Sequence, residues 1–291
     1  MRVLVTGATG QLGPYVVETL VRHGHDVIAW SGKRAVELLP GVRSSPVPLE
    51  DELTVRAHWA EARPDAVVHA AALARIDTCY TDPQRAHEVN VCGTERLCEL
   101  ADADRVPLYY VSTDLVFDGQ KGQYREQDQP RPLSVYAQTK ASAERVVLAC
   151  PRNAVFRVSL LYGPGKCGQR TFFDYVLASW QQQRAVAFYA DEWRSPLALI
   201  DAAEALRAGV ENALAGLFHI GGPERLSRWE MGQRMAEAYG ATAALLRRSS
   251  RLENPAPEPR PRDVSLQSTR FLHTVPNWQR HRFPEPWGPA R

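Results

Sequence analysis

The chain alternates short apolar runs with amphipathic stretches over its first 160 residues. The apolar runs are typical of buried strands and lie at residues 3–5, 26–30, 66–70, 108–112 and 154–161. Apolar residues at helical spacing lie between most of these runs and predict helices at residues 54–62, 83–102 and 136–149. Because strands that alternate with helices form βαβ units, the pattern predicts an α/β fold with a doubly wound parallel sheet.

Beyond about residue 160 the pattern becomes less regular. It predicts helices at residues 171–182, 201–213 and 227–239 and strands at residues 186–190 and 217–220, followed by a tail rich in Pro and Arg. We therefore expect a nucleotide-binding domain at residues 1–155 and a smaller C-terminal substrate-binding lobe at residues 156–291. Part of residues 195–220 is expected to return to the first domain.

A glycine loop separates the first apolar run from the first predicted helix. Gly7, Gly10 and Gly13 recur every three residues, and Pro14 falls in the first helical turn, where its missing N–H does no harm. A dinucleotide pyrophosphate binds to backbone amides at a helix N-terminus where no side chain intervenes. The loop therefore predicts a Rossmann fold that binds a dinucleotide. The alternative is a tight turn that contains ordinary glycines.

Tyr136 and Lys140 are one helical turn apart and share a face of a predicted helix. The Lys140 ammonium is expected to bind the nicotinamide ribose and to lower the pKa of Tyr136 from its ordinary value of about 10. Tyr136 would then exchange a proton with a substrate oxygen. Thr113 ends a strand at the carboxyl edge of the sheet, where it would hold the same oxygen. The alternatives are a surface tyrosine stacked on a lysine stem, and a threonine that caps a helix.

The end of the second predicted strand bears on the choice of cofactor. NAD-binding folds of this type usually place Asp or Glu there, whereas this chain has Ser31, Lys33 and Arg34. Basic residues at this position favour the 2′-phosphate of NADP(H), with NAD(H) left open. The alternative is a solvated basic turn that does not contact the cofactor.

Composition argues against several other classes of protein. With 291 residues, 44% hydrophobic content and a formal net charge of +2, the chain can bury a full core and shows no sign of a nucleic-acid partner. No apolar run approaches the ~20 residues of a membrane span, and the first strand begins at Arg2, so we expect a soluble, cytoplasmic protein. The five cysteines contain no CxxC pair, and we expect reduced thiols and no metal site.

Seven segments carry a family resemblance. They are VTGATGQLG (5–13), HAAAL (69–73), NVCGT (90–94), STDLVFDG (112–119), YAQTK (136–140), RVSLLYG (157–163) and RPRDVSL (260–266). Together they resemble the extended short-chain dehydrogenases, and within that superfamily they are similar to the dTDP-4-dehydrorhamnose reductases and to the regulatory beta subunit of methionine adenosyltransferase. The resemblance implies a Rossmann domain that binds NADP(H) or NAD(H), and a nucleotide sugar between the two lobes.

The resemblance also implies roles for individual residues. The cofactor would lie against Gly7, Gly10, Gln11, Leu12, Gly13, Leu49, Ala70, Ala71 and Ala72. Thr113, Tyr136 and Lys140 correspond to the catalytic trio of the family. Related dehydratases have Asp-Glu after the matching threonine, whereas this chain has Asp114 followed by Leu115, which disfavours dehydration.

Substrate-binding residues are expected at Asp114, Trp193, Arg194 and Arg260. Trp193 would stack on a base or a sugar, and Arg194 or Arg260 would pair with a diphosphate through its planar guanidinium. The alternative is that Trp193 seals the hinge between the lobes and that both arginines are solvated.

These features predict an NADP(H)-dependent reductase of a 4-keto nucleotide sugar. One alternative is a nucleotide-sugar 4-epimerase that retains its cofactor. The other is a dinucleotide-binding regulatory subunit that docks on a partner enzyme through a tail at residues 277–291. The protein is accordingly expected to act as a homodimer or with a partner enzyme.

Overall fold

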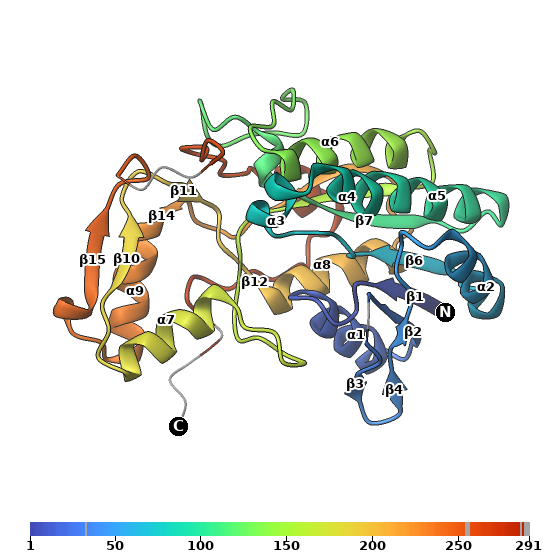
Figure 1. The fold of residues 1–291 in the computed structure, drawn as a ribbon, viewed down its shortest axis with the longest axis horizontal. Helices are drawn as coiled ribbons and strands as arrows, with labels where there is room; N and C mark the ends of the chain where they lie inside the picture. Colours follow the sequence, from blue (N-terminus) through green and yellow to red (C-terminus); the bar gives the residue numbers. More distant parts are fainter. Residues whose placement is uncertain (33, 254–256, 286, 288–291) are drawn as a thin grey trace.

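A parallel sheet of seven strands forms the centre of the larger domain (Figure 1). The computed structural model describes residues 1–32, 34–253, 257–285 and 287, so the predicted cofactor residue Lys33 lies outside the described residues. The strand order is β13-β8-β7-β6-β1-β2-β5. The strands are β1 Arg2–Thr6, β2 Asp26–Ser31, β5 Ser45–Pro46, β6 Ala66–His69, β7 Leu108–Thr113, β8 Ala154–Val158 and β13 Gly216–Ile220. The predicted α/β fold is confirmed.

Helices cover both faces of this sheet, because successive residues of a buried parallel strand point to opposite faces. In β1, Val3 and Val5 share a core with α1 and α8, whereas Leu4 belongs to the core on the other face. The first face is covered by α1 Gly13–Arg22 and α8 Leu199–Glu211. The second is covered by α2 Glu52–Ala62, α5 Gly93–Ala103 and α6 Val135–Leu148.

The other elements of the larger domain are short. They are the antiparallel pair β3 Glu37–Leu39 and β4 Val42–Arg43, the helices α3 Ile76–Thr81, α4 Pro83–His87 and α10 Thr269–Thr274, and a 3₁₀ turn at Asp114–Val116. Within the described part of the chain, no helix has the length and apolarity needed to cross a bilayer.

A smaller lobe lies beyond the carboxyl ends of the central strands, at the left of Figure 1. Its core lies between helices and a parallel strand pair that is separate from the central sheet. The elements are α7 Phe172–Gln181, β10 Val186–Tyr189, α9 Arg228–Tyr239 and β15 Leu246–Ser249. Two-residue strands connect this lobe to the larger domain: β9 Leu161–Tyr162 pairs with β12 Leu197–Ala198, and β11 Trp193–Arg194 pairs with β14 Leu226–Ser227. Between β12 and β14, the chain returns to the central sheet through α8 and β13.

The single helix predicted at residues 83–102 is interrupted. A π-helical segment, Glu88–Cys92, separates α4 from α5. Asn90 lies in this segment, and its side-chain amide accepts a hydrogen bond from Leu73 N (2.7 Å) and donates one to Thr139 Oγ1 (3.0 Å). A single π-helical turn adds one residue to the helical repeat, and the residues on either side of it keep a helical spacing, so the sequence pattern predicts one continuous helix.

A buried ion pair joins α6 to the sheet. Arg157 on β8 donates from Nη2 to Glu144 Oε2 on α6 (2.6 Å) and from Nε to Glu144 Oε1 (2.9 Å), and both side chains are about 97% buried. Ser112 Oγ on β7 donates to the same carboxylate. Each charge is thus neutralised inside the protein, and three elements of the larger domain meet at one carboxylate.

We predict that Glu144→Gln lowers the free energy of unfolding by about 3 kcal/mol, because it leaves the Arg157 guanidinium buried without a countercharge. Urea unfolding followed by circular dichroism measures this change. The matched control is Glu52→Gln, which removes a carboxylate from the exposed pair with Arg56 and is expected to cost under about 0.5 kcal/mol. Equal losses in the two variants would contradict the prediction.

Candidate active site

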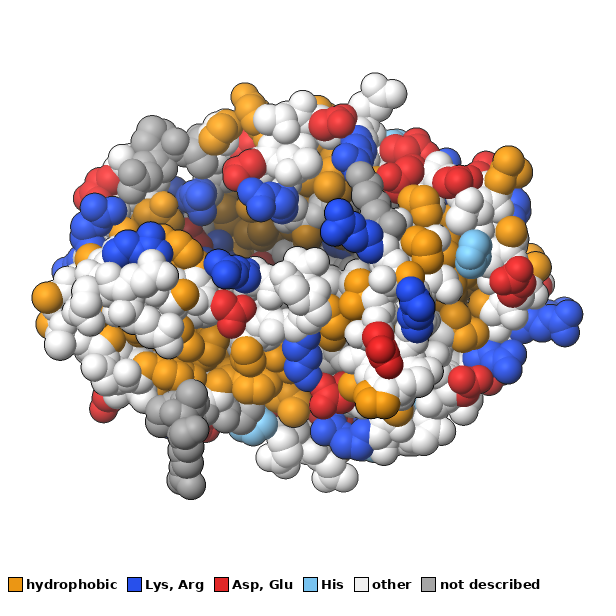
Figure 2. Space-filling view, turned by 60° about the horizontal axis from the view of Figure 1, so that its bottom comes forward, with side chains coloured by type: hydrophobic (Ala, Val, Ile, Leu, Met, Phe, Trp, Pro, Cys, Tyr) orange, Lys and Arg blue, Asp and Glu red, His pale blue; other side chains and the backbone are white. Residues whose placement is uncertain are grey.

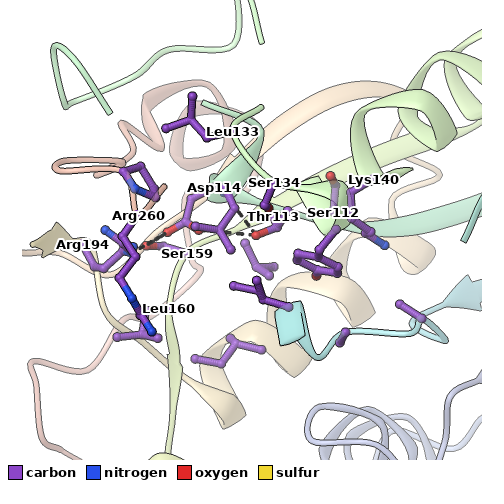
Figure 3. A pocket seen from close by; sticks show the side chains of 18 of the residues that line it. Ser112, Thr113, Asp114, Leu133, Ser134, Lys140, Ser159, Leu160, Arg194 and Arg260 are labelled. Carbon is purple, nitrogen blue, oxygen red and sulfur yellow. Dashed lines mark hydrogen bonds and ion pairs between the residues drawn. The ribbon is translucent and has the colours of Figure 1, made fainter. Parts of the chain in front are cut away.

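A cavity of about 480 Å³ lies between the carboxyl ends of the central strands and the smaller lobe. Figure 2 shows a hollow on the face between the two lobes, with apolar walls and basic side chains along its edge. One wall carries residues of β7 and α6, and the opposite wall carries residues of the smaller lobe (Figure 3). This is the position where open α/β sheets bind their ligands.

The glycine loop packs too tightly for side chains at two of its three glycines. Gly7 has a φ of +68°, and a Cβ atom there would lie 2.6 Å from Ala71 N. A Cβ atom on Gly13 would lie 2.2 Å from Gly7 O. Gly10 N donates to Gly7 O (2.9 Å), which closes the turn at the start of α1. The backbone cradle that a pyrophosphate requires is therefore present.

A second cavity of about 230 Å³ lies on the other side of this loop. It shares Gly10 and Ala72 with the larger cavity, so one elongated ligand could extend along both. Its lining includes the predicted cofactor residues Gly7, Ser31, Leu49 and Ala71, while Gln11, Leu12 and Ala70 line the larger cavity.

Among the residues that the structure describes, the basic side chain that lines the smaller cavity is Arg85 and not the predicted Arg34. Arg34 is exposed and does not line it, and Ser31 Oγ donates to Arg34 O (2.7 Å) within the turn. Arg85, on α4, lines the cavity instead and lies 3.8 Å from Glu50. Arg85 is 54 residues from Ser31 in the sequence, and no motif marks it.

Thr113, Tyr136 and Lys140 lie on one wall of the larger cavity. Ser134 Oγ caps the N-terminus of α6 by accepting from Ala137 N (3.3 Å), which places Tyr136 in the first helical turn. Thr113 ends β7, and its Oγ1 accepts from Leu115 N (3.2 Å). The structure therefore brings the three predicted catalytic residues together.

The protonation of Tyr136 differs from the prediction. Burial raises its pKa well above the ordinary value of 10, and the nearby Asp114 carboxylate raises it further. Lys140 is not among the groups that shift this pKa, and its Nζ donates to Val111 O (2.7 Å). The prediction that Lys140 lowers the pKa of Tyr136 is thus wrong for this state, and Tyr136 keeps its proton at neutral pH. A protonated phenol is the form that can donate a proton to an oxyanion.

A cluster of charged side chains forms the opposite wall of the cavity. Arg194 Nη2 lies 3.0 Å from Glu192 Oε1, and Arg194 Nε lies 3.9 Å from Asp114 Oδ2. Arg228 Nε lies 3.4 Å from the same Glu192 oxygen. Arg260 also lines the cavity, with its guanidinium 5.5 Å from the centre of the Tyr189 ring. Three guanidinium groups therefore lie together on this wall, where they could bind an anionic ligand, while Asp77 and Glu258 also line the cavity.

Asp114 lies between these arginines and the wall that carries Thr113 and Lys140 (Figure 3). Its Oδ2 accepts from Ser159 Oγ (2.8 Å). Burial raises the pKa of Asp114, although the Arg194 charge and the Ser159 hydrogen bond oppose this rise.

Trp193 does not line the cavity, in contrast to the sequence-based expectation. Its ring lies close to two guanidinium groups, with Arg225 at 4.9 Å and Arg262 at 5.3 Å from the ring centre. Successive residues of an extended strand point to opposite sides, so Glu192 and Arg194 face the cavity and Trp193 faces away. Glu192 and Arg228 also line the cavity, and neither was predicted as a site residue.

Comparisons with known proteins agree on the family. The model of the family described as RmlD substrate binding domain matches residues 1–282. Methionine adenosyltransferase 2 subunit beta of Bos taurus is 31% identical over 291 residues, which cover 97% of this chain and 84% of that protein. The structure of a hypothetical dTDP-4-dehydrorhamnose reductase from Sulfolobus tokodaii is 26% identical, with a TM-score of 0.83 and 94% of each chain covered. UDP-glucose 4-epimerase of Thermus thermophilus, in complex with NAD, is 28% identical, with a TM-score of 0.81 and coverage of 96% of this chain and 94% of that one.

We predict that Gly13→Ala lowers the melting temperature and abolishes dinucleotide binding, because the new methyl group would collide with the Gly7 carbonyl. Differential scanning fluorimetry with and without NADPH measures both effects. The matched control is Gly32→Ala, where a Cβ atom meets nothing within 4 Å, and its melting temperature should stay close to that of the wild type. A Gly13→Ala protein as stable as this control would refute the steric argument.

Proposed function

Because the chain belongs to the RmlD substrate binding domain family, we propose that it is an NADP(H)-dependent reductase of a 4-keto nucleotide sugar. The observation that carries this proposal is one cavity wall that holds Thr113, Tyr136 and Lys140 and extends to the glycine loop. The oxidoreductases among its relatives, including the reductase fold from Sulfolobus tokodaii, support the reaction class. The nucleotide sugar and the 4-keto position are parts of the proposal.

Each residue of the proposed site has a separate role in this reaction. Gly7, Gly13 and the N-terminus of α1 would hold the cofactor pyrophosphate, and the bound nicotinamide would supply a hydride to the carbonyl carbon. Tyr136 donates its phenolic proton to the carbonyl oxygen, and solvent later restores that proton. Thr113 donates a hydrogen bond to the same oxygen. Lys140, which lines the same wall, binds the ribose hydroxyls.

The preference for NADP(H) rests on charge. The chain places Ser31 and Gly32, and no carboxylate, at the end of β2, where NAD-selective folds bind the ribose 2′-hydroxyl through an acidic side chain. Arg85 adds a guanidinium to the same cavity, where a 2′-phosphate would compete with Glu50 for it.

The diphosphate of the substrate is assigned to the arginine wall. Arg194 and Arg260 were expected there from the sequence, and Arg228 adds a third guanidinium. Burial lowers the pKa of Arg228, and the charges of Arg194 and Arg260 lower it further, whereas Glu192 raises it. A bound dianion would relieve the repulsion among the three guanidinium groups.

We predict that the purified protein oxidises NADPH in the presence of a 4-keto nucleotide sugar, and that Tyr136→Phe lowers kcat by about 10²- to 10⁴-fold. Absorbance of NADPH measures turnover, and fluorescence titration of NADPH shows that the variant still binds the cofactor. Wild-type protein that binds NADPH and reduces no member of a panel of such sugars would contradict the proposal. NAD that co-purifies with the protein and sugar epimerisation without net oxidation would instead indicate a 4-epimerase.

We predict that Arg228→Met raises the KM for the nucleotide sugar by roughly tenfold to a hundredfold, since a hydrogen bond between charged groups contributes about 1.5–3 kcal/mol. The kcat should change much less, because Arg228 is remote from the reacting carbonyl in this proposal. Arg234→Met is the matched control, because Arg234 lies on the same helix and pairs with Glu224 outside the cavity. An unchanged KM in Arg228→Met would remove Arg228 from the substrate site.

The names of several relatives favour a second candidate, a dinucleotide-binding regulatory subunit of a methionine adenosyltransferase. Size-exclusion chromatography with light scattering would detect a complex between this protein and the methionine adenosyltransferase of the same organism. A stable complex that forms equally well with the Tyr136→Phe variant would support this function. Its absence, together with NADPH turnover, would exclude it.

A further inference from the structure

The ammonium of Lys140 lies against the face of an aromatic ring inside the protein. Lys140 Nζ is 3.9 Å from the centre of the Tyr110 ring, and it donates a hydrogen bond to Val111 O (2.7 Å). Lys140 is 2% exposed and Tyr110 is fully buried. Tyr110 and Val111 are neighbours on β7, the strand that ends at Thr113.

The groups around Lys140 do not provide an ion pair. Glu144 lies one turn along α6, but its carboxylate is engaged by Arg157 and Ser112. His69 on β6 is kept neutral, because burial and the charge of Lys140 lower its pKa to about 3. Tyr136, on the same helix, keeps its proton. Among the described residues, no carboxylate comes within 4.0 Å of Lys140 Nζ, so the ring face and the Val111 carbonyl are its partners.

We infer that Tyr110 is a positioning residue whose ring face takes the place of an anion, keeping the Lys140 side chain charged and directed along the cavity wall. The negative face of an aromatic ring attracts an ammonium group, and this attraction is strongest where water is excluded. A carboxylate in the same place would bind the ammonium N–H groups and compete with the hydroxyls of a ribose. The ring stabilises the charge and leaves N–H donors free. The inference about the Tyr110 ring rests on the contacts of Lys140 Nζ, whereas the use of Lys140 on a ribose rests on the proposed function.

The Lys140 amine changes its protonation state near neutral pH. Burial lowers its pKa to about 7, while Glu144 opposes this change. The ammonium is therefore present below about pH 7 and is lost as the pH rises through that value. Removal of the ring attraction would make the charged form less stable, so the Lys140 amine would lose its proton at a lower pH.

The test is an NMR titration of the lysine side chains, which is practical because the chain contains only four lysines. The 13Cε signal of Lys140, assigned with Lys140→Arg, reports its protonation directly and without cofactor. In the wild type we expect its midpoint near pH 7. In Tyr110→Leu the midpoint should move down by about one pH unit, whereas Tyr110→Phe, which keeps the ring, should retain the wild-type midpoint.

Tyr109→Leu is the matched control. Tyr109 is the adjacent residue of β7 and is equally buried, but it belongs to the core on the opposite face of the sheet. This variant should lose stability and leave the midpoint of Lys140 unchanged. If Tyr110→Leu does not fold, a trifluorinated phenylalanine at position 110 keeps the shape and weakens the negative ring face, and it should also lower the midpoint. An unchanged or higher midpoint in Tyr110→Leu or in the fluorinated protein would overturn the inference.

A titration of NADPH against pH separates this inference from the proposed function. If both hold, NADPH affinity falls as the pH rises through the midpoint of Lys140, and in Tyr110→Leu it falls at a lower pH than in the wild type. A shifted lysine midpoint with pH-independent NADPH affinity would leave the role of Tyr110 intact and contradict the proposed use of Lys140.

Discussion

The buried ion pair between Glu144 and Arg157 is the interaction on which the site depends. It fastens α6, which carries Tyr136 and Lys140, to β8, and through Ser112 to β7, which carries Thr113. Burial of two charges is costly unless they pair in good geometry and their remaining hydrogen-bonding groups have partners. The pair therefore restricts α6 to one position on the sheet. That restriction places the three side chains of the proposed reaction on one wall.

Burial also determines the electrostatics of that wall. The same exclusion of water raises the pKa of Tyr136 and lowers that of Lys140, because each group is disfavoured in its charged form. The wall that carries Tyr136 and Lys140 therefore holds a protonated phenol and an amine whose pKa is about 7. The opposite wall holds the arginines, and Asp114 lies between the two. A ligand with a neutral reacting carbonyl and a negatively charged remainder fits this division of charge, which agrees with a nucleotide sugar.

Sequence patterns predicted the strands and helices of the larger domain, and those residues lining the cavities whose positions depend on local structure. The glycine loop, the Tyr136/Lys140 pair and Thr113 each occupy a strand end or a helix start, so their positions follow from the element that carries them. The predictions were weaker where position depends on a remote partner. Trp193 was expected in the cavity and faces away, Arg34 is exposed, and Arg85, Glu192 and Arg228 line the two cavities although none of them was predicted as a site residue.

The amino-acid sequence by itself determined the βαβ framework, the glycine turn and the spacing that puts Tyr136 and Lys140 on one helical face. These features arise from interactions between residues close together in the chain, where periodicity and backbone preference act. Only the tertiary structure decided the partners of the charges: Glu144 with Arg157, Lys140 with the Tyr110 ring, and Arg228 with Glu192. The pKa of a buried group depends on the water it loses and the charges it meets, and those come from distant segments that only folding brings together.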